Sequence, residues 1–213
     1  MNTRFPTVLA ASLAILLVGS LPAAVAKPKS KPTCAKKGSK TVLASRDARA
    51  YTAKRSVNGS PSKRLYGCWK ATGRRVALAD AFDDGYTTSA TFSDVRLAGR
   101  YVAWYGTATD VSCKASCPPD YVATKSRVNS WDLRRRKRVR SADATVTSPG
   151  LVLTERAGLA WVEGSGPSSQ VRAADSSGTR VLDTGAIAPA SLRAEISIVS
   201  WVRDGVERFA RLR

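Results

Sequence analysis

Residues 95–104 read VRLAGRYVAW, and this stretch recurs in degraded form at three other places in the 213-residue chain. The other copies are TVLASRDARAY at 41–51, LVLTERAGLAW at 151–161 and LRAEISIVSW at 192–201. Each copy ends in an aromatic residue, and successive aromatic residues are 53, 57 and 40 positions apart. This spacing indicates repeated units of roughly 40 residues with loop insertions.

A second column of residues supports the same alignment. It pairs an apolar residue with an aromatic or small residue three positions later, at Tyr66/Trp69, Val128/Trp131, Val171/Ala174 and Val206/Phe209. In the first three units a turn and one more short apolar run follow. Short runs rich in Val, Leu, Tyr and Trp, separated by Gly, Ser, Asp and Pro, are typical of strands. Each unit is therefore predicted to be a four-stranded antiparallel meander, with its aromatic residues packed between neighbouring units.

The pieces VNSWD at 128–132 and AADSSGTRV at 173–181 are similar to the third strand and following turn of a β-propeller blade. The chain thus resembles, over residues 41–213, the WD-repeat-like or PQQ-dehydrogenase-like propellers of exported bacterial proteins. The resemblance concerns architecture alone and implies an all-β fold of four degenerate four-stranded blades. With four units, such a fold would form either a small irregular ring or an open fan. A two-sheet sandwich is the alternative fold.

The N-terminal segment predicts export. Residues 1–26 combine Arg4, an apolar run at 8–18 and the cleavage pattern AVA at 24–26, which together are typical of a signal peptide. An uncleaved N-terminal anchor is the alternative, although the apolar run is shorter than the ~20 residues that a membrane span needs. Residues 27–40 are rich in Pro and Lys and predict a basic arm before the repeat domain at 41–213. We therefore expect a secreted or cell-envelope protein with no span after signal cleavage.

Four cysteines in an exported chain favour disulfide bonds. Cys113 and Cys117 are close enough in sequence to staple one loop, which would pair Cys34 with Cys68. A metal site is the alternative, but the chain has no histidine and the cysteine spacing is not that of a zinc ribbon.

The chain is strongly basic. Removing the single charge of the signal segment lowers the net charge from +19 to +18. Such a surface attracts polyanions, and for an exported protein the nearest are envelope polymers and anionic lipids, with DNA as a further alternative. The most conspicuous charge cluster replaces the glycine-containing turn of neighbouring units and is expected at a hairpin tip, where it could contact a polyanion: Arg134, Arg135, Arg136, Lys137, Arg138 and Arg140.

Catalytic and cofactor motifs are absent from the sequence. There is no histidine, no G-x-S-x-G and no phosphate-binding glycine loop. Four aspartates lie between the first two units without the spacing of a calcium loop, and are interpreted as a connecting loop: Asp80, Asp83, Asp84 and Asp94. A carboxylate pair for glycoside hydrolysis could be supplied by two different blades, and the four glutamates of the chain are Glu155, Glu163, Glu195 and Glu207.

These features predict a binding or scaffold module that uses no metal or cofactor and engages an anionic envelope polymer or a protein partner. The alternative is a hydrolase or lyase that acts on an acidic polysaccharide at the centre of the blades. Carboxylates converging on the centre would favour the enzyme, whereas an apolar centre would favour the binding module.

Overall fold

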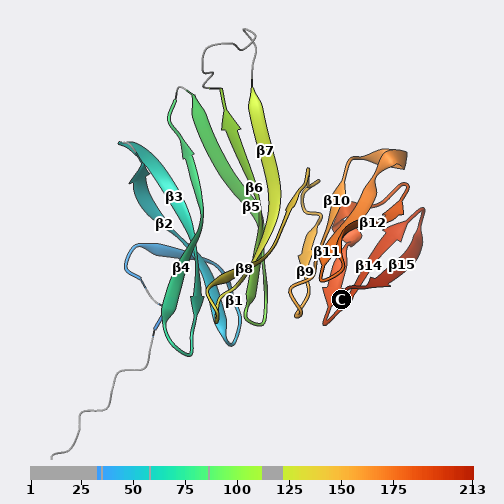
Figure 1. Cartoon of the computed structure of the whole chain (residues 1–213), viewed down its shortest axis with the longest axis horizontal. Coiled ribbons are helices and arrows are strands. Elements are labelled where there is room, and N and C mark those ends of the chain that lie inside the picture. The colour runs from blue at the N-terminus through green and yellow to red at the C-terminus, as the bar shows by residue number, and fades with distance from the viewer. Residues whose placement is uncertain (1–32, 35, 58, 86, 112–121) are drawn as a thin grey trace, which may run out of the picture. The chain divides into compact units, whose positions relative to one another are not determined.

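The computed structural model describes residues 33–213 except residues 35, 58, 86 and 112–121, and the elements below all lie in the unit Pro32–Arg213. Apart from two short 3-10 helices, η1 (Gly166–Ser168) and η2 (Pro189–Ser191), the elements are strands, so the all-β prediction is confirmed (Figure 1). The strands are β1 (Ser39–Ala44), β2 (Ala48–Val57), β3 (Ser60–Trp69), β4 (Arg74–Asp83), β5 (Thr88–Ala98), β6 (Tyr101–Asp110), β7 (Ala123–Asp132), β8 (Lys137–Asp143), β9 (Leu151–Leu153), β10 (Leu159–Glu163), β11 (Gln170–Asp175), β12 (Gly178–Thr184), β13 (Arg193–Glu195), β14 (Ile198–Arg203) and β15 (Val206–Arg211).

The strands form three antiparallel sheets, and the prediction of four separate four-stranded blades is wrong. Strands β1 to β8 form one eight-stranded sheet in sequence order, β12-β11-β10-β9 form a second sheet, and β13-β14-β15 form a third. Within the described residues no sheet closes on itself, and three sheets also exclude the two-sheet sandwich.

The joint between β4 and β5 accounts for the difference. It consists of two residue pairs, Phe82 with Ala90 and Asp83 with Ser89. The adjoining turn is closed by Asp84, whose Oδ1 accepts hydrogen bonds from the backbone N–H groups of Thr87 and Thr88 at 2.9 Å. A sequence repeat indicates which strands pair inside one unit, but it carries no information about pairing between units.

Three core clusters hold successive layers together. The first joins the two halves of the eight-stranded sheet, β2 and β3 against β5 and β6, through Ala48, Ala50, Leu65, Val95, Val102, Trp104 and Leu133. The second joins β6 to β8 with β9 and β10 through residues that include Ala103, Val128, Leu151 and Trp161. The third joins the opposite face of β10 and β11 to the last sheet through residues that include Val162, Val171, Val199 and Leu212. The four-stranded sheet therefore lies between the other two (Figure 1).

The four aromatic residues of the first repeat column are buried, with exposed fractions of 0% to 5%: Tyr51, Trp104, Trp161 and Trp201. The three tryptophans belong to the clusters between layers, whereas Tyr51 packs in a separate cluster beside Cys34 and Cys68. Buried aromatic side chains each remove on the order of 150–250 Å² from water, which makes them major contributors to packing. The predicted packing between units is therefore confirmed for the three tryptophans and wrong for Tyr51.

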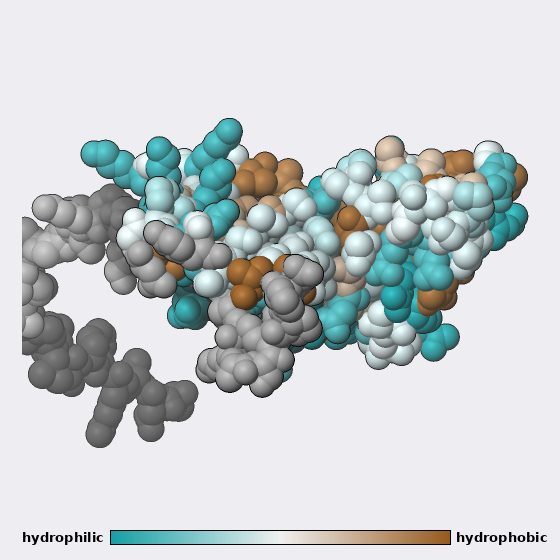
Figure 2. All heavy atoms as spheres, turned by 90° about the horizontal axis from the view of Figure 1, so that it is seen from above, coloured by the Kyte–Doolittle hydropathy of each residue, from teal (hydrophilic) through white to brown (hydrophobic). Residues whose placement is uncertain are grey.

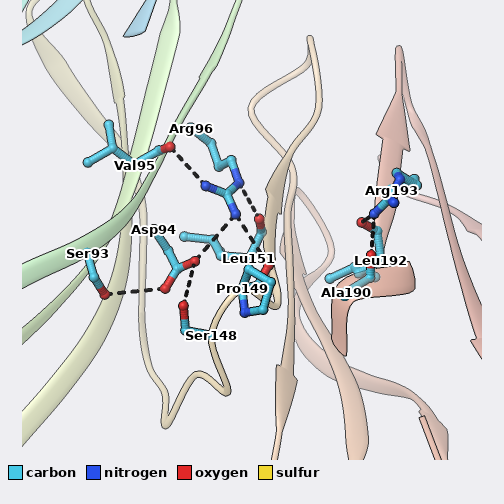
Figure 3. Close-up of polar contacts among 10 residues, drawn as sticks. All are labelled: Ser93, Asp94, Val95, Arg96, Ser148, Pro149, Leu151, Ala190, Leu192 and Arg193. Atoms are coloured by element: carbon cyan, nitrogen blue, oxygen red, sulfur yellow. Dashed lines mark hydrogen bonds and ion pairs between the residues drawn. The ribbon is translucent and has the colours of Figure 1, made fainter. Parts of the chain in front are cut away.

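A polar contact links β5 to the segment before β9 (Figure 3). The Arg96 guanidinium donates hydrogen bonds to the carbonyl oxygens of Leu151 at 2.7 Å and Pro149 at 3.3 Å. The Ser148 hydroxyl donates to the carboxylate of Asp94 at 3.3 Å, and the Asp94 side chain is almost fully buried. Backbone carbonyls that no strand uses are thereby satisfied by the neighbouring sheet.

The first strands are fixed by a disulfide bond. Cys34 is bonded to Cys68 of β3, as predicted, and both cysteines are buried. The Arg49 guanidinium donates to the Cys34 carbonyl at 2.9 Å, and the Tyr51 and Tyr66 rings stack beside the disulfide with centroids 5.2 Å apart. Strand β1 begins at Ser39, within the range expected to be the basic arm. Cys113 and Cys117 lie outside the described residues, so their pairing stays a prediction.

Strand β15 is an open sheet edge. The Leu212 N–H donates a hydrogen bond to the Ser197 carbonyl. In an antiparallel pair, alternate residues direct their backbone groups toward and away from the partner strand. The backbone groups of Glu207, Phe209 and Arg211 therefore point away from β14. The Phe209 side chain is 78% exposed. Hydrophobic surface is visible at the end of the molecule where β14 and β15 lie (Figure 2).

Candidate anion-binding surface

The hairpin turns β1–β2, β3–β4, β5–β6 and β7–β8 lie at one end of the eight-stranded sheet, which we call the turn end. The predicted basic cluster is at this end: Arg134–Arg136 form the β7–β8 turn, and Lys137 and Arg138 begin β8. All five side chains are exposed. Arg140 is different, because it is half-buried within β8 and donates to the Val139 carbonyl at 3.0 Å.

Two buried residues clamp the base of this turn. The Asp132 carboxylate accepts a hydrogen bond from the Arg135 N–H at 3.0 Å and lies 3.2 Å from the Arg100 guanidinium. Leu133 is 1% exposed and fills the core cluster between the two halves of the sheet. The exposed arginines therefore extend from a fixed base.

Arg136 adopts a backbone conformation that favours glycine. Its φ is +56°, in the left-handed region, where a Cβ atom is unfavourable. In the equivalent β3–β4 turn the residue immediately before the outer strand is Gly73, with a φ of +64°. The arginine at this position therefore carries local backbone strain, and strain of this kind gathers at functional sites.

A cleft of about 710 Å³ adjoins the turn and receives residues from several hairpins. We call it the turn-end cleft. It is lined by three arginines, two aromatic residues, two carboxylates and a glycine: Arg100, Arg134, Arg156, Trp69, Tyr101, Asp47, Glu155 and Gly99. The cleft is thus a mixed surface with an excess of positive charge.

Arg100 is the most fixed of the three arginines. Its guanidinium lies over the ring of Tyr101 at 4.8 Å, bonds the Tyr101 hydroxyl at 2.5 Å and faces the Asp132 carboxylate. About a third of its side chain stays exposed. A guanidinium held in one orientation loses little conformational freedom when it binds an oxyanion.

The other charged groups of the cleft are not neutralised by one another. Within the described residues, the side chains of Asp47, Arg134, Glu155 and Arg156 form no ion pair or hydrogen bond. Opposite charges therefore line one cleft while remaining available to a ligand.

The sequence interpretation missed Arg100 and Arg156, although the repeat contained a signal for both. Arg46, Arg100 and Arg156 occupy the sixth position of the first three copies, in the first turn of each unit. Arg100 and Arg156 both line the turn-end cleft, whereas in the first copy the lining residue is Asp47, next to Arg46.

The four aspartates weighed for calcium are dispersed. Asp80 forms a bidentate ion pair with Arg64 at 2.5 Å, Asp83 and Asp84 shape the β4–β5 turn, and Asp94 faces Arg96. A search of the described residues finds no cluster of three or more potential metal-ligating side chains. It finds no helix with the length and apolar character needed to cross a bilayer either.

A groove lined by residues of β5, β9, η2 and β13 has a volume of about 330 Å³. Its charged lining residues are Arg96 and Arg193, and no carboxylate lines it. Carboxylates therefore do not converge there.

Glu163 lies elsewhere, in a cleft beside β7 and β8. Burial raises the pKa of Glu163, but hydrogen bonds from Trp161 at 2.8 Å, from Arg172 at 3.1 Å and from the Thr145 N–H at 3.1 Å outweigh it, so the net shift of the pKa is downward. A carboxylate that is held ionised by three donors is suited to joining sheets and ill suited to donating a proton as a general acid.

Comparisons with known proteins find no matching family model, no similar curated protein and no similar solved structure.

Proposed function

We propose that the protein is a non-catalytic, exported binding module whose turn end engages an anionic polymer of the cell envelope. The observation that carries the proposal is the clamped β7–β8 turn, which presents Arg134, Arg135 and Arg136 to solvent beside the turn-end cleft. Guanidinium groups bind carboxylate, sulfate and phosphate oxygens through paired hydrogen bonds. The strained backbone of Arg136 adds support.

Export is supported by the N-terminal segment and by the disulfide bond. Cys34–Cys68 is buried beside stacked tyrosines, and disulfide bonds of this kind are typical of oxidising compartments. For an exported chain, anionic envelope polymers are among the nearest candidate polyanions.

The groove beside β5, β9 and β13 supports a binding role over the hydrolase or lyase alternative. Its charged lining residues are two arginines, so it offers no carboxyl group as general acid or nucleophile.

The test is retention of the purified protein on an immobilised polyanion during a salt gradient. The triple variant Arg134→Ser/Arg135→Ser/Arg136→Ser should elute at distinctly lower salt. The slope of log affinity against log salt concentration should also be less steep by about 2 to 3, because each lost charge contact removes about 0.7–0.9 from that slope. The matched control, Lys54→Ser/Arg55→Ser/Lys63→Ser, removes the same charge from exposed positions near the opposite end of β2 and β3. Equal shifts in both variants would show that net charge alone causes retention and would refute the proposal.

A further inference from the structure

The lining of the turn-end cleft is unusual for a site that takes a dense polyanion. Asp47 and Glu155 stand among three arginines and have no side-chain partner in the described part of the chain. A site for polyphosphate gains nothing from such carboxylates, because each repels the ligand. Their presence indicates that the ligand also donates hydrogen bonds.

Hydroxyl groups are the donors that fit. An ionised carboxylate accepts hydrogen bonds from hydroxyls, and such charge-assisted bonds are roughly twice as strong as neutral ones. Sugar rings carry several hydroxyls each, whereas polyphosphate carries none.

Trp69 and Tyr101 provide the third element of the site. Both line the cleft and both are partly exposed, so they offer an apolar wall beside the charged groups. Aromatic side chains present large, rigid apolar faces, against which the C–H face of a sugar ring can pack.

We propose that the turn-end cleft binds sugar units of a carboxylated polysaccharide. The sugar carboxylates contact Arg100, Arg134 and Arg156, and the sugar hydroxyls donate to Asp47 and Glu155. This inference rests on the proposed polyanion binding and specifies the ligand class. The ligand is a polymer in which each sugar ring carries hydroxyl groups and one negatively charged carboxylate.

The test compares three soluble polymers at one ionic strength: polygalacturonate, which has carboxylates and hydroxyls; polyacrylate, which has carboxylates without hydroxyls; and polyphosphate. Removal of the two cleft carboxylates, Asp47→Ala/Glu155→Ala, should weaken binding of polygalacturonate by at least about tenfold, as expected for lost hydrogen bonds to charged groups. The same variant should bind polyacrylate and polyphosphate more tightly, because repulsion is removed. Isothermal titration calorimetry measures all three affinities.

The matched control, Asp143→Ala/Asp204→Ala, removes two exposed carboxylates that do not line the cleft. It should strengthen binding of all three polymers slightly. If Asp47→Ala/Glu155→Ala also strengthens polygalacturonate binding, or leaves it unchanged, the sugar inference is refuted while polyanion binding stands. If the unmodified protein binds none of the three polymers, the proposed function itself is refuted.

Discussion

Asp175 and Arg180 form a bidentate ion pair across the β11–β12 hairpin, with guanidinium-to-carboxylate distances of 2.8 and 2.9 Å. The Asp175 carboxylate also accepts the backbone N–H groups of Ser177 and Arg213, both at 2.8 Å. Since the Asp175 side chain is fully buried, these four bonds replace its hydration and tie the end of the last sheet to the middle one.

We expect Asp175→Asn to lower the free energy of unfolding by about 2–4 kcal/mol, because hydrogen bonds to a buried charge are lost and Arg180 keeps no partner. The control is Asp143→Asn, which breaks the exposed ion pair with Arg127 and should change stability by less than about 1 kcal/mol. Urea unfolding followed by tryptophan fluorescence measures both. Equal effects would show that the Asp175 network contributes no more than a surface pair.

The protein should lose stability in acid. The Arg180 hydrogen bonds hold the pKa of Asp175 far below its usual range despite its burial. Burial raises the pKa of Glu163 and of Asp183, but hydrogen bonds from neighbouring donors outweigh it in both, so both values are also lowered. A carboxyl group whose pKa is lower in the folded state stabilises the fold above its unfolded pKa of about 4, and this contribution is lost as pH falls through the folded pKa. Urea midpoints should be similar at pH 7 and 5 and should fall steadily from pH 4 to pH 2. A midpoint independent of pH in that window would contradict the assignment.

The disulfide should contribute strongly. Cys34 and Cys68 are 34 residues apart, and a cross-link of that length stabilises a fold by about 3–4 kcal/mol through the unfolded state. The variant Cys34→Ser/Cys68→Ser should therefore melt at a lower temperature in differential scanning calorimetry. Addition of a reductant should lower the melting temperature of the unmodified protein by a similar or larger amount. If only the double variant melts at a lower temperature and the reductant has no effect, the loss of stability comes from a packing defect and the predicted contribution of the disulfide is wrong.

Gly67 and Leu133 should be coupled. A Cβ atom on Gly67 would lie 2.2 Å from the Leu133 Cδ2 atom, so Gly67→Ala should cost about 1–3 kcal/mol of stability by overpacking. Leu133→Ala alone should cost about 2–5 kcal/mol through the cavity that it leaves. In a double-mutant cycle, the combined variant should be more stable than the sum of the two single-variant losses predicts, by about 1 kcal/mol or more. Strict additivity would contradict the contact.

Arg136 should show a conflict between stability and binding. Arg136→Gly relieves the positive φ and should raise the free energy of unfolding by up to about 1 kcal/mol while weakening polyanion retention. Arg134→Gly is the control, because Arg134 has no positive φ and the same substitution there should bring no gain in stability. Chemical denaturation and salt-gradient retention of the same two proteins separate the two effects.

Strand order within each meander could be predicted, because the buried aromatic residues Tyr51, Trp104 and Trp161 mark the same strand in successive units. The eight-stranded sheet could not, since the pairing of β4 with β5 depends on two residue pairs and the side chain of Asp84. The hairpin-tip position of Arg134 followed from local alignment.

The turn-end cleft needed the tertiary structure. Residues as far apart as Asp47 and Arg156 line it, and their proximity depends on which ends of the strands meet. The arginine repeated as Arg46, Arg100 and Arg156 was the one local indication of it, and two of these three residues line the cleft.

The clamp at the base of the β7–β8 turn has a consequence for evolution and for engineering. Asp132 and Leu133 supply the buried contacts, so the three exposed residues that follow can be exchanged with little effect on the core. Ligand preference at this tip is therefore free to change while the fold is conserved, and the turn is a suitable place for grafting short recognition sequences.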